Sequence, residues 1–207
     1  MLGEEQKRVR AYVAGGYYAK NKGLKELQEE LLHNVENLNA TAIKIKIGDP
    51  NAGISEDMKR VEAARNAIGP NIDLLVDANC AFDLNTAIEY AKEMENYDIY
   101  WFEEPLAIHD FKAHKTLNSS TSLMIAAGEN YYTLADFETL IENNGAGMLN
   151  VDATICPGYD VALKVAKLAQ KKGLKIDIKE TFENTKIFEE KFYWVEDITF
   201  AKTLDYK

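Results

Sequence analysis

Three short apolar runs, each closed by a carboxylate, decide how this chain folds: LLVD at residues 74–77, IYWFE at 99–103 and MIAAGE at 124–129. The closing residues Asp77, Glu103 and Glu129 follow one another at an interval of 26 residues (77 to 103, 103 to 129). A charged side chain at the end of a buried strand needs a partner, because an unpaired charge out of water is very costly. Carboxylates that recur with the period of one strand–helix unit predict one shared partner, a divalent cation.

The same alternation of strand and helix extends on both sides of these runs. Apolar residues at helical or alternating spacing predict strands and helices throughout the chain. The other expected strands are 9–14, 42–47, 148–151, 174–178 and 192–195, and the expected helices are 24–38, 55–68, 83–94, 109–117, 134–143, 159–172 and 183–191. We expect Ser55 to cap the second helix and Asp83 the third, because both side chains can accept a hydrogen bond from the first helical turn.

Strict alternation of strands and helices predicts right-handed βαβ units and a parallel sheet. A doubly wound sheet and a closed (β/α)₈ barrel share this pattern. Eight strands with charged residues at many of their C-terminal ends favour a TIM-type (β/α) barrel, because those ends meet at one central mouth in that fold. We expect one barrel domain over residues 1–207. This length lies at the lower edge of the usual range of about 200–400 residues, so a truncated or incompletely closed barrel stays open.

Composition limits the partners. The net charge of −10 and the pI near 4.9 argue against nucleic acid, because no basic stripe is available to meet phosphates. No apolar stretch approaches the roughly 18–20 residues of a membrane span, and MLGEEQKRVR at the start has no secretory apolar region. Two cysteines, Cys80 and Cys156, do not form a disulfide framework, so we expect a cytoplasmic protein.

Two lysines are the candidates for proton transfer. In AIKIKI at 42–47, Lys44 and Lys46 share one face of the expected strand, and the isoleucines occupy the other. If the isoleucines meet the helices, both lysines point into the barrel. One ammonium buried beside another has a lowered pKa, which makes a lysine usable as a general base near neutral pH. The alternative is an edge strand with solvated lysines.

Hard oxygen ligands at Asp77, Glu103 and Glu129 suit Mg²⁺. Asn79 lies two residues beyond Asp77 and either orients substrate or water, or forms a turn. Glu104, beside Glu103, is expected to hold a ligand or a lysine in place. A lysine base next to a divalent cation is suited to removing the proton alpha to a carboxylate. At the end of the first strand, residues 15–18 (GGYY) predict either a substrate contact or a turn with packing aromatics.

These motifs together resemble the enolase superfamily. The resemblance rests on Lys44 and Lys46, VDAN at 76–79, WFEEP at 101–105, AGEN at 127–130 and Asp152 at a strand end, and runs from about Ala11 to Glu196. Glu129 as third ligand, His109-Asp110-Phe111 and the segment from Gly158 to Gly173 make the chain most similar to the mandelate racemase subgroup and its acid-sugar dehydratases.

The resemblance implies that Asp77, Glu103 and Glu129 bind Mg²⁺, that Lys46 is the acid/base, and that Lys44 assists it or contacts the substrate carboxylate. It implies that Glu196 hydrogen-bonds that carboxylate. Asp152 matches the subgroup's strand-six aspartate. The implied reaction is dehydration of a sugar acid to a 2-keto-3-deoxy acid, and the expected assembly is a homo-oligomer or a complex with a cap-bearing chain.

Two departures bear on turnover. The subgroup pairs its strand-six aspartate with a strand-seven histidine, but that position holds Lys179, or Glu180 if the alignment shifts by one residue. Lys179 either substitutes as a base or is a surface lysine. The family's N-terminal α+β capping domain is expected to be absent, because the first strand starts within the first dozen residues.

Two other hypotheses compete with the dehydratase. One is an inactive or incomplete barrel that binds metal but needs a separate cap or partner subunit. The other, an epimerase with paired lysines, requires a lysine at the sixth strand end, where Thr154 and Ile155 stand instead.

Overall fold

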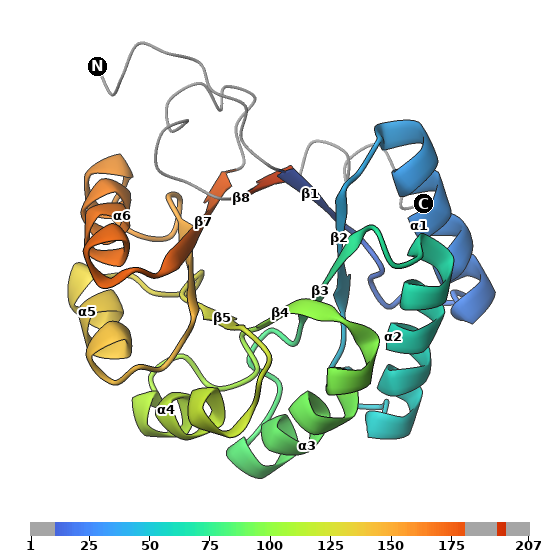
Figure 1. The fold of residues 1–207 in the computed structure, drawn as a ribbon, viewed down its shortest axis with the longest axis horizontal. Helices are drawn as coiled ribbons and strands as arrows, with labels where there is room; N and C mark the ends of the chain where they lie inside the picture. The colour runs from blue at the N-terminus through green and yellow to red at the C-terminus, as the bar shows by residue number, and fades with distance from the viewer. Residues whose placement is uncertain (1–10, 181–193, 198–207) are drawn as a thin grey trace.

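The computed structural model describes residues 11–180 and 194–197. Within them, parallel strands form a closed barrel in the order β1 to β8, and the helices lie around its outside (Figure 1). The strands are β1 (Ala11–Ala14), β2 (Ala42–Lys46), β3 (Asp73–Asp77), β4 (Ile99–Glu103), β5 (Ile125–Ala127), β6 (Met148–Asp152), β7 (Lys175–Glu180) and β8 (Trp194–Asp197). The predicted TIM-type barrel is confirmed, and β8 closes the sheet by pairing with both β7 and β1.

The described helices follow the strands one by one. They are α1 (Leu24–Leu38), α2 (Ile54–Ile68), α3 (Leu84–Met94), a short 3₁₀ helix (Glu95–Tyr97), α4 (Phe111–Ser120), α5 (Leu134–Glu142) and α6 (Tyr159–Lys172). The helix expected at 183–191 lies outside the described residues. Among the helices that the structure describes, none combines the length and the hydropathy that a membrane span requires.

Of the two residues predicted to cap helices, one does so and the other does not. Asp83 caps α3 as predicted, because its side chain accepts a hydrogen bond from the Thr86 backbone N–H. Ser55 does not cap α2. The turn after β2 brings Gly53 into an extended conformation, and its carbonyl accepts hydrogen bonds from the Glu56 and Asp57 N–H groups, so the helix begins at Ile54.

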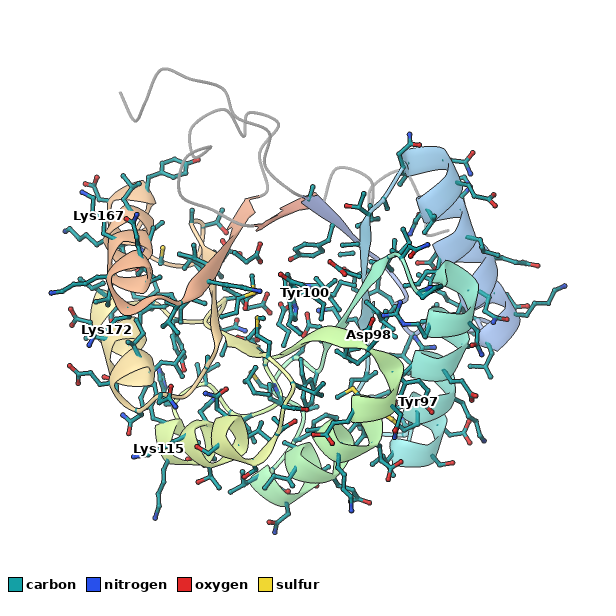
Figure 2. The ribbon with its side chains drawn as sticks, viewed as in Figure 1. Tyr97, Asp98, Tyr100, Lys115, Lys167 and Lys172 are labelled. Atoms are coloured by element: carbon teal, nitrogen blue, oxygen red, sulfur yellow. The ribbon has the colours of Figure 1, made fainter. Side chains whose placement is uncertain are left out.

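Side chains alternate across each strand, which divides the core into two layers. Side chains that point outward, such as Ile43 and Ile45 of β2, are buried beneath the helices. The inward layer fills the barrel and includes Tyr12, Ala14, Ala42, Leu75, Trp101, Ala126 and Met148. Lys44 lies in this interior with 1% exposure, so the edge-strand alternative is wrong. Figure 2 shows side chains filling the centre of the ring.

Candidate metal centre

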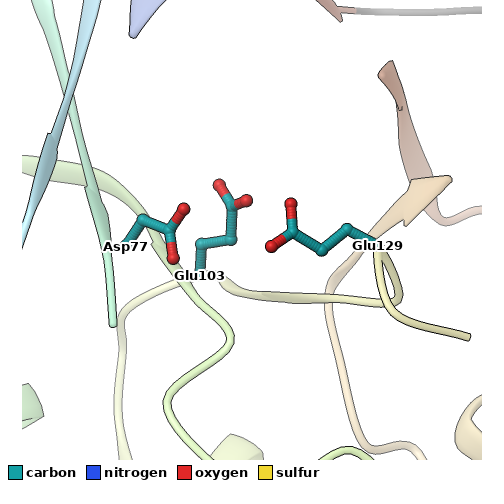
Figure 3. Close-up of side chains that lie close together, drawn as sticks. All are labelled: Asp77, Glu103 and Glu129. Atoms are coloured by element: carbon teal, nitrogen blue, oxygen red, sulfur yellow. The ribbon is translucent and has the colours of Figure 1, made fainter. Parts of the chain in front are cut away.

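Three carboxylates meet at the C-terminal ends of neighbouring strands (Figure 3). Asp77 ends β3 and Glu103 ends β4, and their Cα atoms are partners in the sheet register. Glu129 follows β5 by two residues and reaches the same point from the next loop. One oxygen from each side chain lies within 4.8 Å of the others, and Asp77 and Glu103 are fully buried. We call these three residues the carboxylate cluster.

Both predicted lysines contact this cluster. Lys44 Nζ lies 3.1 Å from Glu103 Oε1 and 3.3 Å from Asp77 Oδ2. Lys46 Nζ lies 2.5 Å from Asp77 Oδ2, and its side chain is 16% exposed, against 1% for Lys44. The two lysines are therefore distinct: Lys44 is enclosed in the barrel, whereas Lys46 lies at the mouth, where a substrate has access.

The donor set fits a hard divalent cation. Among these five side chains, three carboxylates carry three formal negative charges and two lysines carry two formal positive charges, so one negative charge remains that a cation would balance. Carboxylate oxygens are the ligands that Mg²⁺ prefers, and Mg²⁺ commonly retains water or substrate oxygens in its remaining positions. Trp101, which sequence reasoning did not single out, donates from Nε1 to Glu103 Oε2 at 2.9 Å and holds that carboxylate from within the barrel. Its place two residues before Glu103 on one strand face was the available signal.

The loops after β3 and β4 adopt left-handed backbone conformations directly beyond the carboxylates. Asn79 has φ of 43°, Cys80 of 61° and Glu104 of 40°. Non-glycine residues in this region are uncommon and cost of order 1–3 kcal/mol each, which surrounding contacts must offset. Asn79 supplies such contacts: its backbone N–H donates to Asp77 Oδ1 at 2.9 Å and its Nδ2 to Glu129 Oε1 at 3.2 Å. Asn79 therefore forms the turn and also joins two members of the cluster.

Glu104 ties together the loops after β3 and β5. Its Oε2 accepts hydrogen bonds from Asn130 Nδ2 at 2.7 Å and from Cys80 Sγ at 3.6 Å, and its side chain is buried. Burial raises the pKa of the Cys80 thiol to about 12, and the adjacent Glu104 carboxylate adds to the rise. Cys80 therefore stays a thiol at neutral pH and acts as a packing residue, since the thiolate is the nucleophile.

Asp152 contacts its own turn. Its Oδ1 accepts hydrogen bonds from the Thr154 N–H at 2.7 Å, the Thr154 hydroxyl at 2.6 Å and the Ile155 N–H at 3.2 Å. In the sheet register the Lys179 Cα pairs with those of Asp152 and Glu196, so the three residues occupy one row of neighbouring strands. The side chains of Lys179 and Glu196 lie outside the described residues. His33 is in α1, His109 precedes α4 and His114 is in α4, away from β7.

Comparison with known proteins identifies the family. Residues 26–186 match the family described as Enolase C-terminal domain-like, which is more than half of the chain. The chain belongs to this family. The resemblance to the enolase superfamily is thereby confirmed over the strands that carry the carboxylate cluster.

The relatives found include sugar-acid dehydratases. L-talarate/galactarate dehydratase of Salmonella typhimurium is 33% identical over 176 residues, which are 85% of this chain and 43% of that protein. Arabinonate dehydratase of Saccharolobus solfataricus is 29% identical over 173 residues, or 84% of this chain and 46% of that protein. The chain therefore spans less than half the length of these two relatives.

A solved structure of a sugar-acid dehydratase has a similar fold. L-talarate dehydratase from Polaromonas sp. JS666, complexed with Mg and L-glucarate, superposes with a TM-score of 0.86 at 29% identity. The superposition covers 97% of this chain and 56% of that chain.

Proposed function

We propose that this chain binds Mg²⁺ at Asp77, Glu103 and Glu129 and removes the proton alpha to the carboxylate of a sugar acid, leading to its dehydration. The observation that carries the proposal is the place of Lys46: its ammonium lies at the mouth, 2.5 Å from a carboxylate of a three-carboxylate cluster. The relatives that act as dehydratases of galactarate and arabinonate support this substrate class.

Lys46 and Lys44 have different roles in the proposed reaction. Lys46, as the amine that forms when its ammonium loses a proton, takes the α-proton, and the electrons of the broken C–H bond form the enediolate of the acid. The β-hydroxyl then leaves, and the resulting enol becomes a 2-keto-3-deoxy acid, with net loss of water. Bound Mg²⁺ supplies positive charge beside the substrate carboxylate. Lys44 adds a second positive charge at the same place from within the barrel.

Two further roles belong to the proposal. Asn79, exposed at the mouth and hydrogen-bonded to Glu129, orients the substrate. Glu196, on the last described strand, contacts the substrate carboxylate. Asp152 lies in the same row of the sheet, because Lys179 is the Cα partner of both Asp152 and Glu196. No residue is assigned as the acid that assists departure of the β-hydroxyl.

The test is exchange of the α-proton with deuterium oxide, followed by NMR with Mg²⁺ and a panel of aldonates and aldarates. Lys46→Met should lower the exchange rate by about 10²–10⁴-fold, the contribution typical of a general base. Mg²⁺ binding, measured by calorimetry, should not weaken in this variant, because the three carboxylates remain. Lys59→Met is the matched control, because Lys59 is an exposed lysine of α2 paired with Glu56.

Two results would contradict the proposal in different ways. If Mg²⁺ gives neither heat nor a thermal shift, both the ligand assignment and the reaction fail. If Mg²⁺ binds but no acid exchanges its α-proton, the chain is the inactive metal-binding barrel that the missing strand-seven histidine also allows.

A further inference from the structure

A pocket of about 510 Å³ opens beside the carboxylate cluster, between the loops that follow β1, β2 and β3. Its size lies within the range of about 300–1,000 Å³ typical of small-molecule sites. Lys46 and Asn79 line the pocket, and each also contacts the cluster, through Asp77 and Glu129 respectively. The pocket is therefore continuous with the proposed reaction site on the Lys46 side.

The walls combine an apolar surface with hydrogen-bonding groups. Tyr17 and Ala81 supply apolar area, and the Lys46 ammonium lies 5.9 Å from the centre of the Tyr17 ring. Asp49 and Asn79 add polar side chains at the rim. A carbon chain that carries hydroxyl groups needs this combination, because its carbons favour apolar contact and its hydroxyls must keep hydrogen bonds.

A buried carboxylate outside the cluster holds these walls. Asp57 of α2 is fully buried, and its Oδ2 accepts hydrogen bonds from the Gly48 N–H and from the Tyr90 hydroxyl, each at 2.9 Å. Its Oδ1 accepts a hydrogen bond from the Tyr18 hydroxyl. Gly48 and Tyr18 both line the pocket, so one side chain ties the loops after β1 and β2 together.

Arg60, one turn further along α2, strengthens the same arrangement. Its guanidinium lies 4.0 Å from the centre of the Tyr18 ring and donates to the Gly16 carbonyl at 2.5 Å. These contacts tie the loops after β1 and β2 to α2. Walls fixed before a ligand arrives reduce the ordering cost of binding.

We propose that this pocket, the tail pocket, binds the hydroxylated carbon chain of the acid beyond its reacting carbons. The proposal rests on the proposed function, because it assumes that the substrate carboxylate binds at the carboxylate cluster and that the substrate α-carbon lies at Lys46. The remaining carbons then lie on the Lys46 side, where the tail pocket begins. It follows that five- and six-carbon acids bind better than a three-carbon acid with the same reacting end.

The test fills the pocket at its exposed rim. Ala81 is exposed, and its Cβ lies against Gly48, so Ala81→Leu places a larger side chain in the tail pocket without disturbing the core. Ala52→Leu is the matched control, because Ala52 lines an adjoining hollow of about 470 Å³ that shares Tyr18 and Asp49 with the tail pocket but is not lined by Lys46 or Asn79. Thermal melting checks the folding of both variants, and Ala81→Ser tests the position without filling it.

Affinity is measured by calorimetry with saturating Mg²⁺ for glycerate, arabinonate, xylonate, galactonate and gluconate. The unaltered chain should bind its best five- or six-carbon acid about tenfold or more tightly than glycerate, and Ala81→Leu should remove that difference. Affinities for glycerate and Mg²⁺ should stay the same in Ala81→Leu, while Ala52→Leu and Ala81→Ser should match the unaltered chain for every acid.

The possible outcomes distinguish failure of the tail-pocket proposal from failure of the proposed function. If all the acids bind equally and still exchange their α-protons, the tail pocket is wrong and the proposed function stands. The tail pocket is also wrong if Ala81→Leu weakens glycerate binding as much as gluconate binding, or if Ala52→Leu has the same effect. If no acid binds and none exchanges, the proposed function fails and the tail pocket fails with it.

Discussion

At the residue scale, the carboxylate cluster depends on a glycine whose replacement would strain the backbone and crowd its neighbours. Gly128 precedes Glu129 and has φ of +127°, a backbone conformation that L side chains rarely adopt. A Cβ at this position would lie 2.5 Å from the Asn150 carbonyl oxygen and 2.8 Å from Phe137. The position of Glu129 therefore follows from the close approach of the β5 loop to β6.

Gly128→Ala should destabilise the chain by roughly 2 kcal/mol or more, from backbone strain and overpacking together. It should also abolish the thermal shift that Mg²⁺ produces, because Glu129 moves with the loop. Urea unfolding measures the loss of stability, and thermal melting with and without Mg²⁺ measures the shift. In Gly53→Ala nothing lies within 4 Å of the added carbon, so this control should lose less than about 1 kcal/mol and keep the shift. Equal behaviour of the two variants would contradict the argument.

Single residues also show what the sequence could and could not predict. The spacing of Asp77, Glu103 and Glu129 and the alternation around Lys44 were enough to place these side chains at one mouth. The ion pairs between the lysines and the carboxylates were not predictable, because they depend on the register that sets Lys46 against Asp77. The sequence suggested two ammonium groups acting on each other; the structure gives each a carboxylate neighbour.

At the scale of elements, the helices were predicted better than the contacts at their ends. Asp57 lies in the first turn of α2, where the positive end of the helix favours a carboxylate. In the structure it is buried beneath the loops after β1 and β2 and holds them. Helical periodicity cannot reveal this role, because the partners Tyr18, Gly48 and Tyr90 come from three other segments.

The helix α4 carries a buried histidine that makes stability depend on pH. Burial lowers the pKa of His114 below its ordinary value, since desolvation disfavours the charged ring. The unfolded chain therefore takes up a proton near its ordinary pKa of about 6.5, while the folded chain resists protonation. The stability from neutral His114 is present above that pKa and is lost as pH falls below it.

The expected result is a stability difference between two glutamine variants. From about pH 7 to pH 5, the unaltered chain and His33→Gln should lose free energy of unfolding more steeply than His114→Gln, by at most about 1.4 kcal/mol per pH unit. His33 is exposed on α1 and is the matched control. Urea titrations across this range provide the measurement, and parallel curves for all three proteins would refute the role of His114.

At the scale of the whole molecule, the barrel is a ring that the last described strand completes. The sequence predicted the order of strands, because each strand alternates with a helix, but left closure open, since the chain is short for this fold. In the structure β8 closes the ring, because its residues Val195 and Glu196 are the Cα partners of Ala11 and Tyr12 of β1. The same strand pairs with β7, so it has no open edge among the described strands.

Closure predicts different consequences for two truncations. A chain that ends at Glu180 loses β8 and exposes one edge of β1 and one edge of β7, and unpaired edges promote association with other chains. It should lose the cooperative thermal transition and elute as a larger species in size-exclusion chromatography. A chain that ends at Asp197 keeps every described strand pair and should melt cooperatively at nearly the temperature of the full chain. If the shorter chain melts and elutes like the longer one, the strand pairs of β8 do not hold the ring closed. In that case the strands other than β8 are enough to support the carboxylate cluster on β3 to β5.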